Sequence, residues 1–462
     1  MFAFHETTRK RICRTGFFAL CLAPTCATAA WIADHHLPWR QAAAARRLSD
    51  RYHLNVELTG FREPRPDLLR TAAATLTDPH AAAPLLKLTG VETHRGETLA
   101  LSIDEVSLSV ADLPALAERL EWSLQRTDAR RIDLLVKQVT LTAPVITQLH
   151  QLKATIERDA AGKLRLRLLA HTTATRAADA KPLGLSLETN APPADAANAD
   201  AAEHVVVTLD TQQNSLPVAL LGPLVPGAAA LNETATYTGI VTWKSSHPLG
   251  GPVAPTWEGA LRGKFAGVDL AKLIPPASSH KLQGSATLEL TDCRWRDDRF
   301  TRLAGTLVAN PDAQLNGDFL FAARKFLGCR IGADHPELQA AAERFADPRL
   351  PRAEGDSVLT ASSLHLEQFA CQFDLDAAGI VIAPCASPED ATGEATDVLA
   401  VANGHPLLLA AADRQASAES GSFTPVRLPA ASWLQFMANS TPQWLPFTPE
   451  AVETARRFPL PQ

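Results

Sequence analysis

The feature that most constrains the fold is a strict alternation of apolar and polar residues within residues 281–311. Apolar or small residues occupy every second position from Leu282 to Leu290, and polar residues occupy the positions between them. A period of two is typical of a strand that buries one face. The charged segment 294–299 predicts a turn, after which the alternation resumes at Leu303. The stretch therefore predicts two neighbouring strands that share one apolar face and one wet face.

The same alternation recurs along most of the chain. It predicts further strands at residues 52–59, 68–77, 85–92, 98–110, 131–142, 145–158, 163–169, 183–189, 205–209, 237–244, 257–269, 358–373 and 379–383. Short helices are expected at 37–50, 112–125, 216–227, 312–331 and 336–345. We predict a mainly β protein: an elongated, curved antiparallel sheet that forms an apolar trough, with a few short helices and an N-terminal membrane helix.

Two local features modify this regular pattern. Asp104 and Glu105 interrupt the alternation, as a β-bulge would. Glycines recur at apolar positions of the expected strands, at Gly239, Gly284 and Gly305, where a missing side chain permits strong curvature or the close approach of a ligand.

The N-terminus predicts a membrane segment. Four basic residues among the first fourteen precede a run without charge that begins at Thr15 and ends at Ala33. This order is typical of an export signal or a signal anchor whose N-terminus stays in the cytoplasm. The run is short and contains Pro24, and residues 27–29 fit a cleavage site, so a retained anchor, a cleaved signal and a buried soluble helix are all open. We favour the retained anchor, a single pass that places the bulk of the chain outside the cytoplasm.

Composition divides the chain into five parts. Residues 1–36 are the cytoplasmic stub and signal anchor, and residues 37–190 and 203–385 are the two parts of the β trough, the second with helices near 312–346. Residues 191–202 are too poor in bulky side chains to pack, which predicts a linker-like loop and a domain boundary. Residues 386–462 join a low-complexity segment, expected to be largely mobile, to a Trp-rich tail. That tail could bind a membrane interface or a partner, or cap the end of the sheet, and its prolines favour the cap.

Two of the seven cysteines are candidates for a disulfide. Cys371 and Cys385 flank an Asp-Ala-Ala-Gly turn at residues 376–379, which would bring the two ends of a hairpin opposite each other. Two unpaired buried thiols are the other interpretation. An exported location would permit the disulfide.

A search for chemistry gives no reaction motif. There is no GxSxG, HExxH or Walker A sequence, and no GxGxxG after a strand. The carboxylates at 297–298 lie in a charged turn, and the cations at 163, 165 and 167 are typical of a solvated strand face. A net charge of -6 provides no basic field for nucleic acid. We therefore predict no enzyme activity, no catalytic residue, no metal site, no cofactor and no nucleic-acid partner.

Several segments resemble the AsmA-like family of envelope proteins, relatives of the TamB-type and bridge-like lipid-transfer proteins. They are the basic and then uncharged N-terminus that leads into YHLNVELTGF, and the runs at 131–157, 299–311 and 364–382. The likeness covers roughly residues 10–385 and is one of texture, without a diagnostic motif. It implies an inner-membrane helix and a long curved sheet, folded into an aliphatic trough in which the acyl chains of phospholipids lie. It implies no catalytic residues.

The function expected from the residues and from this resemblance is lipid transport in outer-membrane biogenesis. An apolar sheet face without a second layer must meet helices or lipid, because large exposed apolar patches are rare in soluble proteins. The alternative is a non-catalytic envelope scaffold or secretion-assembly protein that binds other envelope proteins through its sheet edges. The residues expected to line the lipid groove are Leu54, Val56, Leu58, Leu164, Leu166, Leu168, Leu261, Phe265, Leu288, Leu290 and Leu307.

Overall fold

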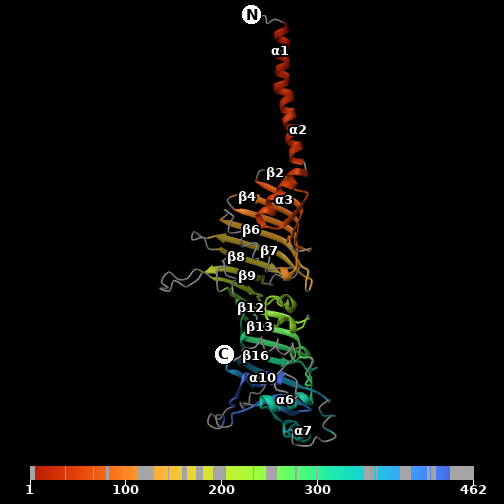
Figure 1. The fold of residues 1–462 in the computed structure, drawn as a ribbon, viewed down its shortest axis with the longest axis vertical. Coiled ribbons are helices and arrows are strands. Elements are labelled where there is room, and N and C mark those ends of the chain that lie inside the picture. Colours follow the sequence, from red (N-terminus) through yellow and green to blue (C-terminus); the bar gives the residue numbers. More distant parts are fainter. Residues whose placement is uncertain are drawn as a thin grey trace, which may run out of the picture. The chain divides into compact units, whose positions relative to one another are not determined.

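Strands supply most of the regular structure, which confirms the mainly β fold class (Figure 1). The computed structural model describes residues 6–36, 38–65, 67–79, 83–96, 98–112, 130–143, 145–158, 164–172, 181–190, 204–232, 234–245, 257–275, 278–297, 299–347, 355, 358–359, 362–385, 397–413, 417 and 423–437. The chain forms two compact units. Unit 1 comprises residues 1–142 and 146–159, and unit 2 comprises residues 143–145 and 160–462.

The N-terminal segment is helical throughout its described part up to residue 36. Helix α1 (Glu6–Phe17) continues through a π-helical turn, η1 (Phe18–Leu22), into α2 (Ala23–His36). The π turn lies just before Pro24, whose ring cannot fit against the carbonyl four residues earlier in a regular α-helix. The stretch Glu6–Ala30 is long and apolar enough to cross a membrane. Its most apolar part is not buried against the rest of the protein. This finding fits both a membrane anchor and a signal sequence.

Unit 1 contains one sheet. Strands β1 (Asn55–Thr59) and β2 (Arg62–Arg65) share one edge of β3, and the sheet continues through β4, β5, β6 and β7. The bounds of these later strands are β3 (Leu68–Thr77), β4 (Pro84–Arg95), β5 (Leu99–Leu108), β6 (Arg131–Leu141) and β7 (Thr147–Arg158).

The pairing of β5 with β6 is parallel, which corrects the prediction of a purely antiparallel sheet. Parallel neighbours require a crossover of a dozen residues or more, and residues 109–130 supply that length. The crossover begins with η2 (Val110–Asp112), and the helix expected at 112–125 lies outside the described residues apart from its first position.

A crease crosses the sheet of unit 1, and we define it by residues 89–90, 104–105, 137–138 and 150–151 of strands β4 to β7. In β5, Ile103 and Val106 are both buried while the two residues between them are exposed. Gly90 and Gln151 have positive φ angles, 61° and 52°, which rotate the following side chains to the same face again. The pairing register of β4 with β5 is the same on both sides of the crease, so no residue is inserted in either strand. The β-bulge predicted at Asp104 is therefore wrong. The alternation is interrupted at the same level in neighbouring strands.

Helix α3 (Pro38–Tyr52) packs on the β1 end of this sheet. Ala44, Ala45 and Leu48 of the helix pack against the buried side chains of Val56 and Leu58. The helix confirms the prediction at residues 37–50, and it covers a strand face that the sequence left open (Figure 1).

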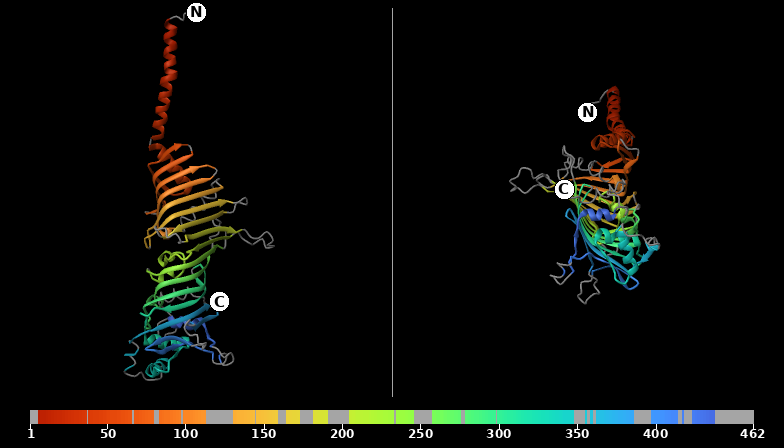
Figure 2. Two further views of the ribbon diagram at one scale, coloured as in Figure 1. Left: turned by 180° about the vertical axis from the view of Figure 1, so that it is seen from behind. Right: turned by 60° about the horizontal axis from the view of Figure 1, so that its bottom comes forward.

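Unit 2 contains a larger antiparallel sheet, whose strands lie side by side (Figure 2). Its neighbours in space are β8, β9, β10, β12, β13, β15, β16, β20, β21 and β24. Their bounds are β8 (Leu164–His171), β9 (Leu183–Asn190), β10 (His204–Asp210), β12 (Thr236–Ser245), β13 (Trp257–Asp269), β15 (Ser285–Arg296), β16 (Arg299–Ala309), β20 (Gln368–Asp376), β21 (Gly379–Pro384) and β24 (Arg427–Leu428). Because β9 and β10 pair directly, residues 191–202 connect two neighbouring strands, and the boundary predicted there is wrong.

Short elements cover the faces of this sheet. Strand β11 (Leu216–Pro217) leads into η3 (Val218–Leu220) and η4 (Ala228–Ala230), and α5 (Leu270–Leu273) follows β13. A three-stranded sheet forms from β14 (Leu282–Gln283), β17 (Gln314–Asn316) and β19 (Ser363–His365). Helices α6 (Gly317–Leu327) and α7 (Pro336–Ala346) follow in the chain, so the helix expected at 312–331 is shorter than predicted. Asn316 caps α6 by accepting from the Phe319 amide at 3.1 Å, and Gly328 ends it with a φ of 64°.

Residues 397–413 and 423–437 are more ordered than the composition predicts. Strands β22 (Val398–Ala402) and β23 (His405–Leu409) form a hairpin that extends from β20 to β18 (Arg330–Ile331). Leu399, Leu407 and Leu408 are buried there, because aliphatic residues are concentrated in these short runs within a stretch otherwise rich in small residues. Helix α10 (Ala430–Met437) packs on the same core through Phe436, which supports the cap interpretation for this part of the tail.

Candidate functional site

One face of the unit 1 sheet is aliphatic. Cross-strand rows run from Leu101 through Leu134 to Ala154, and beyond the crease from Leu88 through Val106 and Val139 to Leu149. Side chains directly opposite each other lie on the same face, so the rows form one surface. We define this apolar face by Leu86, Leu88, Val91, Leu99, Leu101, Ile103, Val106, Leu108, Ile132, Leu134, Val136, Val139, Leu141, Leu149, Leu152, Ala154 and Ile156.

Accessibility on this face varies with distance from the crease. Ile103, Val136 and Val139 beside the crease are 2% to 5% exposed. Leu101 and Leu134, two residues away, are only half-buried. Among the described helices, α3 packs on this face at its β1 end, where Leu86, Leu88 and Leu108 border the helix cluster. The half-buried aliphatic rows further along the sheet are therefore the candidate site.

The opposite face of the same strands is polar and carries ion pairs. Arg70 contacts Glu92 at 3.2 Å and Lys137 contacts Asp104 at 2.7 Å. A hydrogen bond from Arg70 lowers the pKa of Glu92 and keeps this carboxyl charged. Leu135 is the large apolar residue here, 41% exposed. Unit 1 therefore presents one aliphatic face and one charged face.

Unit 2 has an equivalent apolar face, but its own chain covers most of it. One row of cross-strand partners crosses all ten strands, and consists of Leu168, Leu185, Leu209, Val241, Leu261, Cys293, Leu303, Leu375, Ile380 and Leu428. Val218, Leu221 and Val225 pack over the β12–β15 part of this face. The helices and hairpin of the C-terminal core pack over the β16–β21 part.

The burial of the predicted groove residues corrects the lipid-groove prediction for six of them. Leu54, Val56 and Leu58 are buried under α3, while Leu261, Phe265 and Leu290 are buried under residues 218–228. A side chain that protein already covers cannot contact a lipid. Leu288 and Leu307 are partly buried and pack against the two cores of unit 2. Leu166 and Leu168 are half-buried on β8, and the side chain of Leu164 lies outside the described residues.

The sequence missed the aliphatic rows of β4 to β7 as groove residues. The sequence predicts these strands, but the crease breaks their alternation. The predicted groove residues lie instead in strands whose alternation is regular. The register supplies the missing information, because Leu99, Ile132 and Ile156 become neighbours only through strand pairing.

The glycines on the apolar face of unit 2 bring backbones together and leave no room for a ligand. Gly239 and Gly263 are direct partners in β12 and β13. A Cβ atom on Gly239 would lie 2.2 Å from the Arg262 carbonyl oxygen and 2.6 Å from the Tyr237 hydroxyl. Protein atoms occupy the space beside these two glycines, so the ligand interpretation is wrong here.

The disulfide predicted between Cys371 and Cys385 is not formed in the structure, where both are free thiols. Cys371 pairs with Pro384, so Cys385 lies one position beyond the partner of Cys371. Cross-strand disulfides join residues that are directly opposite each other, and this offset separates the two side chains. Burial raises the pKa of the Cys371 thiol to about 12, which keeps it protonated and unreactive.

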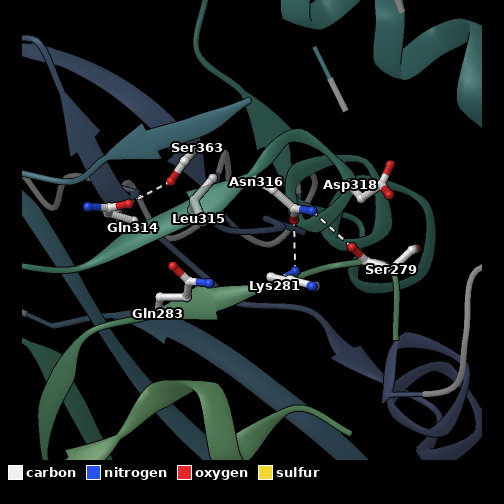
Figure 3. A pocket seen from close by; sticks show the side chains of 8 residues that line it. All are labelled: Ser279, Lys281, Gln283, Gln314, Leu315, Asn316, Asp318 and Ser363. Carbon is white, nitrogen blue, oxygen red and sulfur yellow. Dashed lines mark hydrogen bonds between the residues drawn. The ribbon is translucent and has the colours of Figure 1, made fainter. Parts of the chain in front are cut away.

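A polar hollow of about 370 Å³ lies beside the small sheet of unit 2 (Figure 3). Three of the side chains that line it, Gln314, Asn316 and Ser363, already bond within the protein. Asn316 accepts from the Lys281 amide at 2.8 Å and donates to the Ser279 carbonyl at 2.9 Å, and Ser363 donates to Gln314 at 2.7 Å (Figure 3). These bonds hold β14, β17 and β19 together. The polar groups of the hollow therefore have a structural role, and we do not assign a ligand to it.

A buried Ser278–His280 pair is the other polar feature of unit 2. The Ser278 Oγ lies 2.8 Å from Nδ1 of His280, whose ring is 1% exposed and lies 5.0 Å from the Phe436 ring. Burial lowers the pKa of His280 to about 4, so the imidazole is neutral at physiological pH. The pair holds α10 in place and has no access to solvent. Among the described residues, no three His, Cys, Asp or Glu side chains lie close enough together to hold a metal.

The half-buried aliphatic rows of unit 1 are therefore the candidate binding surface. The resemblance to the AsmA-like family remains a prediction. Comparison of the chain with family models, with curated proteins and with solved structures finds no match.

Proposed function

We propose that this chain is a membrane-anchored envelope protein that holds or moves phospholipid acyl chains on the apolar face of unit 1. The N-terminal helix is its single inner-membrane anchor, and the bulk of the chain lies in the periplasm. The half-buried aliphatic rows through Leu101 and Leu134 carry the proposal. An aliphatic face of several strands is stabilised by contact with hydrocarbon, at about 0.8 kcal/mol for each methylene group removed from water.

The dimensions of the face suit an acyl chain. Strands β4 to β7 contain 12, 10, 11 and 12 residues, so each spans roughly 35 Å at about 3.3 Å per residue. The side chains on the face are aliphatic, almost all of them Leu, Ile or Val, which favours a fluid hydrocarbon chain over a ligand recognised by hydrogen bonds. The proposed activity is therefore carriage of lipid without covalent chemistry.

The experiment is native mass spectrometry of the full chain extracted in mild detergent. Wild-type protein is expected to carry phospholipid, and Leu134→Glu is expected to lose it because a carboxylate would interrupt the hydrocarbon surface. Leu135→Glu is the matched control, since the neighbouring residue of the same strand faces the charged side. Far-UV circular dichroism checks that both variants fold.

Two outcomes would overturn the proposal. One is a folded Leu134→Glu variant that retains as much phospholipid as Leu135→Glu. The other is a wild-type protein that carries no phospholipid and co-purifies with a polypeptide partner, which would favour the envelope scaffold.

A further inference from the structure

Three arginines lie along one rim of the unit 1 sheet, at the ends of its strands. Arg95 is the last residue of β4, Arg158 is the last residue of β7, and Arg130 directly precedes β6. The parallel pairing of β5 with β6 brings these ends together, because Arg95 pairs with Leu99 and Leu99 is in register with Ile132. The Arg158 amide donates to the Arg130 carbonyl at 2.9 Å. We call Arg95, Arg130 and Arg158 the arginine rim.

The register places the arginine rim on the apolar face. Arg95 lies directly opposite Leu99, so its side chain emerges on the side of that leucine. Arg130 precedes Ile132 by two residues and Arg158 follows Ile156 by two, and a period of two keeps such residues on one face. The first aliphatic row of the face, Leu99, Ile132 and Ile156, therefore lies beside the arginine rim.

The neighbouring Arg131 shows how an arginine behaves on the opposite face. It contacts Asp133 and Glu157, each at 3.1 Å. The side chains of Arg95 and Arg130, by contrast, are exposed and have no hydrogen-bond or ion-pair partner within the described part of the chain. One carboxylate, Asp67, lies opposite Arg95 at this rim without forming an ion pair with it.

The charge is confined to one rim. Strands β4 to β7 end at the other rim with Pro84, Leu108, Leu141 and Thr147, and none of the residues described at those ends is basic. Between the two rims, the apolar face carries no charged side chain. A ligand that lies on this face therefore meets hydrocarbon along its length and positive charge at one end.

We infer that the arginine rim binds the phosphate of an anionic phospholipid whose acyl chains lie on the aliphatic rows next to it. A guanidinium group recognises phosphate through two parallel N–H···O bonds and remains charged at any physiological pH. The headgroup lies at the strand ends, and the chains extend from Leu99 and Ile132 toward the crease. This inference rests on the proposed function and adds the headgroup chemistry and the orientation of the lipid.

The test compares phosphatidylglycerol with phosphatidylcholine of the same acyl chains. The full chain in detergent is offered each lipid in mixed micelles, and native mass spectrometry counts the bound molecules. Phosphatidylglycerol is expected to bind about tenfold more tightly, and this preference is expected to fall at high salt because Arg95 and Arg130 are exposed. The double variant Arg95→Ala/Arg130→Ala should lose the preference while still binding phosphatidylcholine.

Three controls keep the inference falsifiable. Arg131→Ala removes an arginine from the charged face of the same strand and should leave the preference intact. Asp67→Asn removes the carboxylate that the structure describes opposite Arg95, and should increase the preference for phosphatidylglycerol. Glycerol phosphate, which has the headgroup chemistry without acyl chains, should not displace the lipid at equal concentration.

The possible failures separate the two proposals. Equal binding of the two lipids by wild-type protein, or equal loss of preference in Arg131→Ala, would overturn the arginine rim and leave the proposed function standing. No binding of either lipid would overturn the proposed function itself.

Discussion

The two units build the same kind of sheet and treat its apolar face in different ways. In unit 2, residues 218–228 and the C-terminal core bury most of the face, including Leu261 and Phe265 at 1% exposure. In unit 1, α3 covers the β1 end, and the rows through Leu101 and Leu134 stay half-buried. The comparison shows that an alternating pattern identifies an apolar face without revealing what will cover it.

The cover over the middle of unit 2 comes from a connection between two of its strands. The chain between β10 and β12 carries Val218, Leu221 and Val225, which are bulky enough to fill the face beneath them. These residues make the middle of unit 2 a closed core, which is stabilised by burial. The rows through Leu101 and Leu134 in unit 1 are only half-buried, so burial should stabilise them less.

The largest expected difference between the units is in the cost of truncating their apolar faces. Phe265→Ala should destabilise unit 2 by about 3–5 kcal/mol, because it empties a closed core, whereas Leu134→Ala should cost unit 1 about 1 kcal/mol. Hydrogen–deuterium exchange mass spectrometry of the full chain reports each unit separately. Equal loss of protection around β13 and β6 would contradict the distinction between a closed and an open face.

A loss of stability between about pH 6.5 and pH 4.5 is expected in unit 2. His280 has a pKa of about 4 in the folded state against 6.5 for a free imidazole, because burial disfavours its charged form. The fold therefore has its full stability above about pH 6.5, and stability declines as the pH falls toward 4, by roughly 3 kcal/mol in total. Exchange at pH 7 and pH 4.5 would show the peptides of α10 losing protection.

His280→Gln is the matched control for this pH dependence, since glutamine can bond Ser278 and does not titrate in this range. The variant should flatten the pH dependence of α10 exchange. An unchanged slope in the variant would assign the effect to another group.

Substitution at the crease should have an intermediate effect on unit 1. Gly90 has a φ of 61°, and a Cβ atom there would lie 1.9 Å from Oδ2 and 2.8 Å from Cβ of Asp104. Gly90→Ala should therefore cost about 1–2 kcal/mol through the left-handed backbone conformation, with crowding against Asp104 in addition. Adding Asp104→Ala, which removes Oδ2 and keeps Cβ, should restore only part of that loss. Full recovery in the double variant would show that crowding, and not the backbone, sets the cost.

The smallest effect is expected on the charged face. Lys137 contacts Asp104 at 2.7 Å, but both side chains are more than half exposed. Water and salt screen such pairs, so Lys137→Ala should leave the thermal unfolding midpoint within experimental error. A clear decrease would mean that the ion pairs help to hold the crease.

Much of the fold could be predicted from local pattern. The strand at 68–77 has the predicted bounds, the hairpin of β15 and β16 pairs Leu288 with Leu307, and α3 lies where a helix was expected. These elements depend mainly on residues close together in the sequence, and the periodicity of apolar residues predicts such local structure well. The parallel pairing of β5 with β6 depends on residues far apart in sequence, and no local pattern encodes it.

The candidate site shows the same division. The sequence identified Leu261 and Phe265 as apolar strand residues, and the structure buries both under residues 218–228. The register, and not the alternation, places Arg95 and Arg130 beside an aliphatic row.

By itself, the sequence determined which residues form strands, which side of each strand is apolar, and that an apolar helix begins the chain, because these depend on side-chain chemistry at short range. The tertiary structure alone decided which apolar faces the chain covers and which strand ends meet at one rim. Those outcomes depend on contacts between distant segments, whose free energy of packing no single stretch of the sequence contains.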